Sequence, residues 1–251
     1  MAVVFLHAHP DDEAIFTGGT IAMLSQRQTR VVVVVATDGD VGAPAEVREA
    51  ETRAAGALLG VARIEFLGYR DSGMTGEASA ATGTFAGAPI DEAALRVAEL
   101  LRDEAASALV VYDEHGIYGH PDHVKVHDVG MRAAQAAGVD CVYEATVDRE
   151  YLHFVETHLV VEAGVPGGKE RHARDLGLAA SALGVPTVAI TTTVDVHPVL
   201  DMKRAAMAAH ASQIPETASP MRLPAAAFRD VYGFEWYVRR GPSGCIDELA
   251  G

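Results

Sequence analysis

The sequence predicts a single α/β domain over residues 1–251, with a three-layer, Rossmann-like fold in which helices cover both faces of a mostly parallel β-sheet. Three observations support this fold class. Short apolar runs alternate with helical segments through the first half of the chain, as in proteins with parallel sheets. Arg30–Ala36 is almost pure valine, which is typical of a strand buried on both faces. No internal repeat or linker divides the chain.

The predicted strands are short apolar runs bounded by polar residues or glycine. They cover Val3–His7, Arg30–Ala36, Arg63–Leu67, Ala108–Tyr112 and Asp140–Glu144. Helices are predicted between them, at Ala14–Gln26, Ala45–Leu59, Ile90–Ala106 and Asp122–Ala137. Asp71–Ala88 has no hydrophobic period and is rich in small residues, so we expect a surface loop there, and Asp113–Gly119 is expected to form a second, polar loop.

The C-terminal part has a less regular pattern. Tyr151–Leu159 and Lys169–Leu183 are predicted helices on either side of a Gly-Val-Pro-Gly-Gly stretch. Thr187–Val196 is rich in β-branched residues and is predicted to be a strand. Pro198–Ala211 begins with proline, which favours the first turn of a helix. Phe228–Arg239 holds most of the late aromatic residues and is predicted to add an edge strand.

The composition argues against several classes of partner. The formal net charge is -15, and such an acidic surface repels nucleic acid and anionic membranes. The apolar runs are too short to span a bilayer and the start of the chain lacks signal-peptide features, so we expect a cytoplasmic protein. Cys141 and Cys245 are the only cysteines and form no C-x-x-C pair, which argues against a disulfide framework or a thiolate zinc site. Whether the chain forms a homo-oligomer is left open.

Two polar clusters follow the first and the fourth predicted strands. The first is the string H-A-H-P-D-D-E, and the second is the string E-H-G-I-Y-G-H-P-D-H. With one more histidine a helical turn further on, they contain six of the eleven histidines: His7, His9, His115, His120, His123 and His127. In open α/β sheets, ligands bind beyond the carboxyl ends of the strands. Two neighbouring parallel strands would therefore bring both clusters to the binding edge of the sheet.

A metal ion explains this grouping of residue types. Zinc binds nitrogen and carboxylate oxygen, and a catalytic zinc site uses three protein ligands and leaves one position for water. A histidine and an aspartate from the first cluster and a histidine from the second would form such a set. A remaining carboxylate would then serve as general base, and spare histidines would stabilise an oxyanion or protonate a leaving amine. Helix capping by Asp11–Glu13 is the alternative explanation, but capping requires no histidines.

The two strings also carry a family resemblance. His9-Pro10-Asp11-Asp12-Glu13 and His120-Pro121-Asp122-His123 resemble the paired motifs of the PIG-L/LmbE-like de-N-acetylases. Leu67–Met74 and Lys203–Gln213 are similar to stretches of the mycothiol branch of that family. The resemblance covers most of the chain and implies an LmbE-like fold. Residues 149–186 show no clear similarity and are expected to be a variable insertion that shapes one wall of the pocket.

The resemblance implies a metal site and a base. His9, Asp12 and His123 would bind Zn²⁺, one ion per chain. Asp11 would be the general base that activates the attacking water and returns the proton to the amine.

It also implies a group of helper and substrate-binding residues. His120 would stabilise the tetrahedral intermediate or act as the acid, and Asp122 would orient His120. Tyr118 would polarise the substrate carbonyl. The residues expected to contact the substrate are Arg48, Arg70, Asp71 and His210.

The sequence therefore predicts a zinc-dependent hydrolase that cleaves a linear amide bond in a small molecule. De-N-acetylation of an N-acetylglucosaminyl-type substrate, in thiol or secondary-metabolite biosynthesis, is the leading hypothesis. Within the family, the alternative is an amidase that acts on mycothiol-type S-conjugates. From other classes, one alternative is a sugar- or nucleotide-binding module without catalysis, although no G-x-G-x-x-G surrounds Gly18-Gly19-Thr20. Another is a structural metal protein, which would need a closed set of four ligands.

Overall fold

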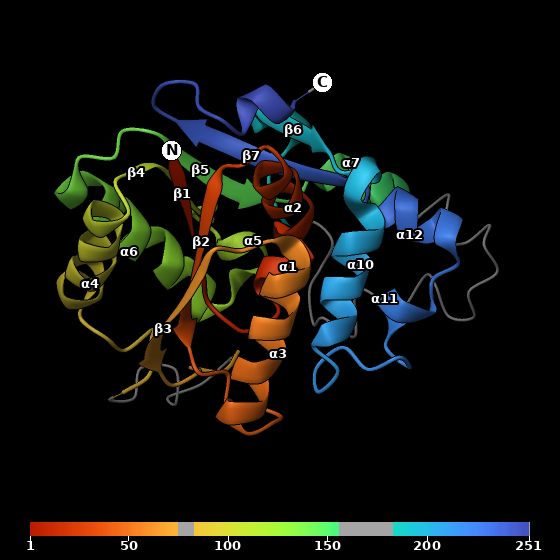
Figure 1. Cartoon of the computed structure of the whole chain (residues 1–251), viewed down its shortest axis with the longest axis horizontal. Helices are drawn as coiled ribbons and strands as arrows, with labels where there is room; N and C mark the ends of the chain where they lie inside the picture. The colour runs from red at the N-terminus through yellow and green to blue at the C-terminus, as the bar shows by residue number, and fades with distance from the viewer. Residues whose placement is uncertain (75–82, 156–182, 251) are drawn as a thin grey trace.

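A seven-stranded sheet forms the centre of the protein. The computed structural model describes residues 1–74, 83–155 and 183–250 (Figure 1). The strand order is β3-β2-β1-β4-β5-β7-β6, in which β1 to β5 are parallel and β7 is antiparallel to both of its neighbours. The strands are β1 Ala2–His7, β2 Arg30–Thr37, β3 Arg63–Tyr69, β4 Ala106–Tyr112, β5 Val142–Thr146, β6 Thr192–Asp195 and β7 Phe234–Arg240. The predicted α/β fold with a mostly parallel sheet is confirmed.

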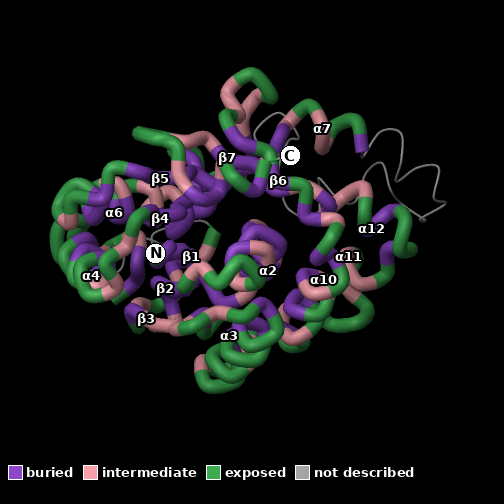
Figure 2. The backbone as a smooth tube through the Cα atoms, turned by 45° about the horizontal axis from the view of Figure 1, so that its top comes forward, coloured by how far each residue is buried: buried purple, intermediate pink, exposed green. Residues whose placement is uncertain are grey.

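Helices pack on both faces of this sheet, as Figures 1 and 2 show. One layer contains α4 Ile90–Asp103 and α6 Pro121–Ala137. The other layer contains α1 Asp12–Phe16, α2 Gly18–Gln26, α3 Ala45–Leu59 and α10 Leu200–Ala209. The shorter elements are α5 Gly116–Gly119, α7 Arg149–Phe154, η4 Thr187–Ala189, η5 His197–Val199, α11 Ser219–Arg222, α12 Ala225–Tyr232 and η6 Asp247–Leu249.

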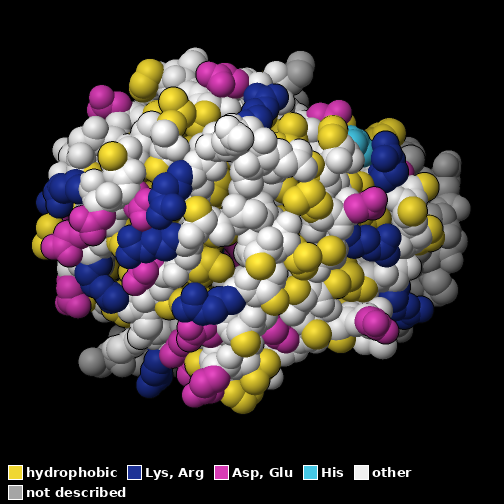
Figure 3. Space-filling model, in the orientation of Figure 1, with side chains coloured by type: hydrophobic (Ala, Val, Ile, Leu, Met, Phe, Trp, Pro, Cys, Tyr) yellow, Lys and Arg dark blue, Asp and Glu magenta, His cyan; other side chains and the backbone are white. Residues whose placement is uncertain are grey.

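The core lies between these layers and explains the valine-rich strand. Every residue from Val31 to Ala36 is fully buried, because helices cover both faces of β2. On the face of the molecule in Figure 3, acidic and basic side chains are intermingled, and histidine is visible at only one place. None of the helices in the described ranges combines the length and the hydropathy that a membrane span requires.

The helix predicted at Ala14–Gln26 is interrupted at Thr17, so that two helices, α1 and α2, replace it. The hydroxyl of Thr17 lies 3.0 Å from Nε2 of His7, and the carboxylate of Glu235 accepts hydrogen bonds from the backbone N–H groups of Gly19 and Thr20 at 2.8 Å each. The contact of Thr17 with His7 accompanies the end of α1, and the carboxylate of Glu235 pairs with the first free N–H groups of α2. A Cβ atom on Gly19 would lie 2.4 Å from Cβ of Val196, so glycine allows the close packing that occurs here.

The C-terminal part differs most from the prediction. Within Thr187–Val196 only β6 is a strand, and it follows a short 3₁₀ helix. The predicted edge strand Phe228–Arg239 is wrong in two respects. Its first residues complete helix α12, and β7 lies inside the sheet, where it pairs with β5 on one side and with β6 on the other. The predicted helix Tyr151–Leu159 is described only as α7, and Lys169–Leu183 lies almost entirely outside the described residues.

Candidate metal centre and active site

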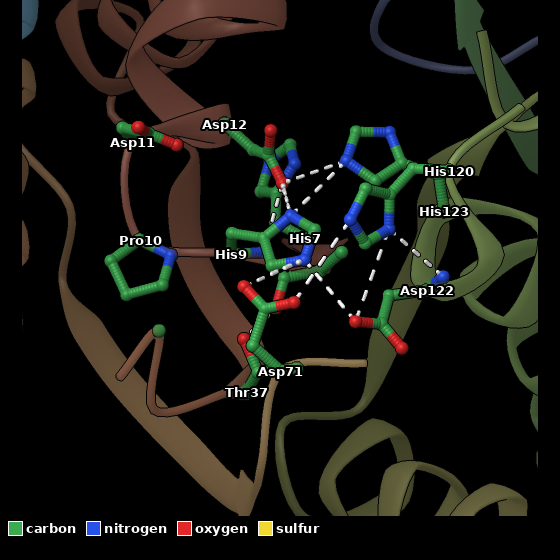
Figure 4. Close-up of polar contacts among 12 residues, drawn as sticks. His7, His9, Pro10, Asp11, Asp12, Thr37, Asp71, His120, Asp122 and His123 are labelled. Carbon is green, nitrogen blue, oxygen red and sulfur yellow. Dashed lines mark hydrogen bonds and ion pairs between the residues drawn. The ribbon is translucent and has the colours of Figure 1, made fainter. Parts of the chain in front are cut away.

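The two polar clusters meet at one edge of the sheet. β1 and β4 are hydrogen-bonded neighbours, and both end at this edge, at His7 and Tyr112. The first cluster continues from β1 into α1, and the second continues from β4 through α5 into α6. Figure 4 shows side chains from both clusters pointing toward one another. The expectation that neighbouring parallel strands would bring the clusters together is confirmed.

Three ligand atoms form a nearly equilateral triangle in this cluster. Nδ1 of His9, Oδ2 of Asp12 and Nε2 of His123 are 3.3 Å apart in each of the three pairs. These separations are long for hydrogen bonds, which are typically about 2.7–3.2 Å for N–H···O. They match a tetrahedral zinc site, in which ligands about 2.0–2.1 Å from the metal lie roughly 3.3 Å from one another. All three side chains are buried, and the spacing of their ligand atoms would fit an ion of the size of zinc.

Asp122 holds the far side of the His9 ring. Its Oδ2 lies 3.3 Å from Nε2 of His9, and its carboxylate also accepts hydrogen bonds from the N–H and the hydroxyl of Ser72 and from the N–H of Ala86. Burial alone would raise the pKa of Asp122, but the hydrogen bonds from His9 and Ser72 lower it. A carboxylate behind a ligand histidine fixes its ring orientation in many metal sites. The sequence interpretation missed Ser72, although Ser72 lies inside the matched stretch Leu67–Met74.

Aromatic rings fix the position of His123. The ring of Tyr112 stacks on it with centroids 4.3 Å apart and an interplanar angle of 21°. Phe16 packs edge-on at 6.0 Å, and the hydroxyl of Tyr118 lies 3.2 Å from Nε2. His123 is completely buried, so its ring has little freedom to leave the triangle.

Asp11 occupies an unusual backbone conformation beside the triangle. It directly precedes α1 and has a backbone φ of 111°, in a region that residues other than glycine rarely adopt. Its Oδ2 lies 3.5 Å from the guanidinium of Arg48, and its side chain is 17% exposed. Burial and the charge of Asp12 raise the pKa of Asp11 to about 7, against the opposing charges of Arg48 and His210. A carboxylate of this kind can both accept and release a proton near neutral pH.

His120 is presented to the site as a neutral donor. Its Nδ1 accepts a hydrogen bond from the backbone N–H of Asp122 at 3.1 Å, so the proton of the neutral ring is on Nε2. Burial, together with the neighbouring His9 and His123, lowers the pKa of His120 to about 4. The carboxylate of Asp122 is 3.9 Å from this ring and 3.3 Å from that of His9. It is therefore better placed to orient His9 than His120.

Comparison with known proteins agrees with this geometry. The family model of PIG-L, described as GlcNAc-PI de-N-acetylase, matches residues 4–134. A 1D-myo-inositol 2-acetamido-2-deoxy-alpha-D-glucopyranoside deacetylase of Salinispora arenicola is 33% identical, over 98% of this chain and 90% of the relative. The chain belongs to the PIG-L family. The predicted family is confirmed, and so is the predicted enzyme class, an amide hydrolase acting on N-acetyl groups.

Solved structures show the same PIG-L fold with more than one chemistry. The N,N'-diacetylchitobiose deacetylase of Pyrococcus horikoshii is similar with a TM-score of 0.60 and 24% identity, over 96% of this chain and 84% of the other. GalB, the 4-carboxy-2-hydroxymuconate hydratase of Pseudomonas putida KT2440, is similar with a TM-score of 0.56 and 15% identity, over 97% and 98%. Because this fold also occurs in a hydratase, the fold alone does not determine the reaction, and the enzyme class rests on the family match and the related sequences.

Two of the four expected substrate contacts have protein partners instead. Arg48 is buried, and its guanidinium donates to the backbone carbonyls of Pro10, Gly39 and Val41. His210 is completely buried against Glu13. This geometry argues against a direct substrate contact by His210, because a fully buried ring cannot reach a ligand without a rearrangement.

The other two expected contacts lie at the loop after β3. Oδ2 of Asp71 is 3.6 Å from Nε2 of His9, and Oδ1 is 4.0 Å from Nε2 of His120. Asp71 therefore lies beside the ligand triangle, next to one of its three residues. Burial opposes its charge, but the hydrogen bond and charge of His9 lower the pKa of Asp71 to about 2. Arg70 is exposed at the end of β3. Both side chains stay candidates for substrate contacts.

His7 supports the site from behind rather than lining it. Its Nδ1 is 3.0 Å from the hydroxyl of Tyr112, and its Nε2 is 3.0 Å from the hydroxyl of Thr17. Burial lowers the pKa of His7 from 6.5 to about 4, although the charge of Asp12 opposes this shift. His7 is therefore a neutral, hydrogen-bonded core residue at physiological pH.

This neutral histidine predicts a specific loss of stability in acid. The unfolded chain gains the proton on His7 below about pH 6.5, whereas the folded protein gains it only near pH 4, so acidification favours unfolding. On going from about pH 7.5 to about pH 5, the wild type should lose about 2 kcal/mol more free energy of unfolding than His7→Gln. Urea unfolding at both pH values and equal zinc concentration measures the difference. An identical pH dependence in the two proteins would show that His7 titrates normally when folded.

Proposed function

We propose that this protein is a zinc-dependent de-N-acetylase that acts on an N-acetylglucosaminyl-type small molecule. The observation that supports it best is the ligand triangle of His9, Asp12 and His123, followed by a further carboxylate, Asp11, that is not part of the triangle. Three ligands with an adjacent base are typical of a hydrolytic zinc site, whereas a structural site closes with four. A binding module without catalysis would need neither the metal nor the base.

The three triangle residues would hold the zinc ion. When bound, zinc supplies Lewis-acid polarisation of the substrate carbonyl and lowers the pKa of a water molecule. The carboxylate of Asp122 keeps the His9 ring turned toward the triangle, and stacking by Tyr112 does the same for His123. The protein thus fixes the ligand geometry before substrate arrives.

Asp11 moves the protons of the reaction. Its carboxylate takes a proton from the attacking water as the new C–O bond forms at the amide carbon. It then gives this proton to the amide nitrogen as the C–N bond breaks, so that a free amine leaves together with acetic acid, which keeps the second proton of the water. Burial and the charge of Asp12 raise the pKa of Asp11 above its ordinary range, which suits a group that must act in both directions.

Two neutral donors would stabilise the oxyanion that develops on the carbonyl oxygen. His120 offers the proton on Nε2, and Tyr118 offers its hydroxyl, whose pKa burial and the charges of Asp12 and Asp11 keep above the ordinary value. Preorganised donors of this kind stabilise the transition state more than the ground state. Neither residue needs to lose its proton for this role.

The amine side of the substrate is proposed to be an amino sugar. The relatives named above act on the inositol glycoside of N-acetylglucosamine and on N,N'-diacetylchitobiose, and both compounds carry an acetamido group on a sugar. Asp71 and Arg70 lie on the same edge of the sheet as the triangle and could bind sugar hydroxyl groups.

A substrate screen with the zinc-loaded protein tests this proposal. We expect about one zinc per chain by elemental analysis, and release of primary amine from one or both of the compounds named above. Amides of thiol conjugates should be included, because faster release from them would replace the deacetylase with an amidase. Absence of bound metal, or no amine release from any of these amides, would contradict the proposal.

A further inference from the structure

The backbone of Asp11 needs a specific support. Its φ of 111° lies in a region that costs strain for any residue with a side chain, and such conformations persist only where their surroundings enforce them. They also occur preferentially at functional sites, where the strain positions a reacting group. The support must therefore come from groups that contact the peptide of Asp11.

A buried carboxylate supplies this support. Oε2 of Glu13 accepts a hydrogen bond from the backbone N–H of Asp11 at 3.0 Å. The other oxygen, Oε1, accepts a hydrogen bond from Nε2 of His210 at 2.6 Å. Glu13 is 1% exposed and His210 is completely buried, so water does not compete for the contact between these two side chains. The carboxylate of Glu13 thus joins the Asp11 peptide to a histidine that lies 197 positions after Glu13 in the chain.

His210 holds Glu13 from a different part of the fold. It follows directly after α10, which packs against both α1 and α3 beside the site (Figure 1). Its own carbonyl accepts the N–H groups of Gln213 and Ile214, which fixes the position of the residue. Burial would lower the pKa of His210, but the charges of Glu13 and Asp11 raise it. This shift favours the protonated imidazole ring, which forms an ion pair with Glu13.

We propose that Glu13 and His210 are positioning residues that hold the Asp11 peptide in its strained conformation and so aim the Asp11 carboxylate at the substrate. This inference rests on the proposed function, because it acts through Asp11 as the base. It assigns His210 a different role from a substrate contact. Without His210, the buried charge of Glu13 loses its partner and the carboxylate is expected to turn away from the Asp11 N–H.

The variants are chosen to separate positioning from packing. His210→Leu removes the donor and keeps the site apolar, and His210→Gln retains a donor near the position of Nε2. Glu13→Gln is isosteric but cannot accept from both partners. The matched control is Lys203→Met, because Lys203 is a buried cation of α10 with its own carboxylate partner, Glu235 at 2.7 Å, and its ion pair does not involve Asp11.

The kinetic result expected for His210→Leu and Glu13→Gln is a fall in kcat of about 10- to 100-fold with little change in KM, as for other small displacements of a catalytic group. Zinc content should stay at that of the wild type. His210→Gln should recover most of the loss, and Lys203→Met should keep kcat while losing thermal stability. The assay uses the inositol glycoside of N-acetylglucosamine. A normal kcat in His210→Leu, or an equal loss in Lys203→Met, would overturn the proposal.

A second readout needs no substrate. Crystal structures of zinc-loaded wild type and Glu13→Gln should show that φ of Asp11 leaves the positive range in the variant, and an unchanged Asp11 peptide would overturn the proposal.

Failure of Asp11 as the base and failure of Glu13 and His210 as positioning residues give different results. If Asp11→Asn hydrolyses the substrate normally, the proposed base is wrong. If Asp11→Asn is inactive and His210→Leu is normal, only the positioning role fails.

Discussion

Asp11→Asn is expected to lower kcat by about 10²- to 10⁴-fold while the protein keeps its zinc. Asparagine has nearly the same shape as aspartate but cannot take the proton from water, and Asp11 is not one of the triangle residues. The measurements are kcat on an acetylated amino sugar and zinc per chain. In the wild type, kcat/KM should fall as the pH drops through the pKa of Asp11, because the base is then protonated. A bound cation lowers that pKa, so this limb lies at or below about pH 7.

Asp40→Asn is a suitable control for this experiment. Asp40 is an exposed carboxylate in the loop after β2 and makes no contact with the ligand triangle. The control should therefore keep both its activity and its acid limb. If Asp11→Asn turns over as fast as the control, another group must activate the water, and the distance of Asp71 from His9 would make Asp71 the next residue to test.

The site could be predicted from the sequence because its residues come in two short strings that begin where strands end. Apolar runs place β1 and β4, and parallel strands end at one edge of the sheet, so His9 and His123 are predicted to meet if the two strands are neighbours, which the structure shows them to be. The family motif then separated Asp11 from Asp12. The roles of these residues stay predictions, but their juxtaposition is what the structure shows.

Other features depend on contacts between distant parts of the chain, which no local pattern reports. α1 ends before Thr17 because of His7, and α2 begins there because of Glu235, which lies 216 positions away from Gly19. His210 is predicted to contact the substrate because it lies in a family motif. Only the fold reveals that Nε2 of His210 is already hydrogen-bonded to Glu13. Likewise, an aromatic run cannot show whether β7 lies at the edge of the sheet or inside it.

His123→Gln is expected to lower zinc content and turnover more than any other single change, because it removes a metal ligand and not a residue that only orients a ligand or moves a proton. The glutamine amide has lower affinity for zinc than imidazole, and two remaining ligands do not hold the ion in a catalytic site. Zinc per chain should fall from about one to near zero after dialysis, and turnover should fall further than in Asp11→Asn. Asp122→Asn should weaken zinc binding less, by about 10- to 100-fold, since it only orients His9.

His127→Gln controls for the loss of a histidine from the same helix. His127 lies one turn beyond His123 on α6, but its Nδ1 contacts the carbonyl of Tyr112 and its ring is not part of the triangle. It should keep zinc and turnover. If His123→Gln also kept its zinc, the metal would have to bind elsewhere, and the second group of ligand atoms, from His9, Asp71, His120 and Asp122, would be the only other candidate among the described residues. The graded series of His123, Asp122 and His127 variants therefore tests the assignment of the ligands themselves, independently of which amide the enzyme cleaves.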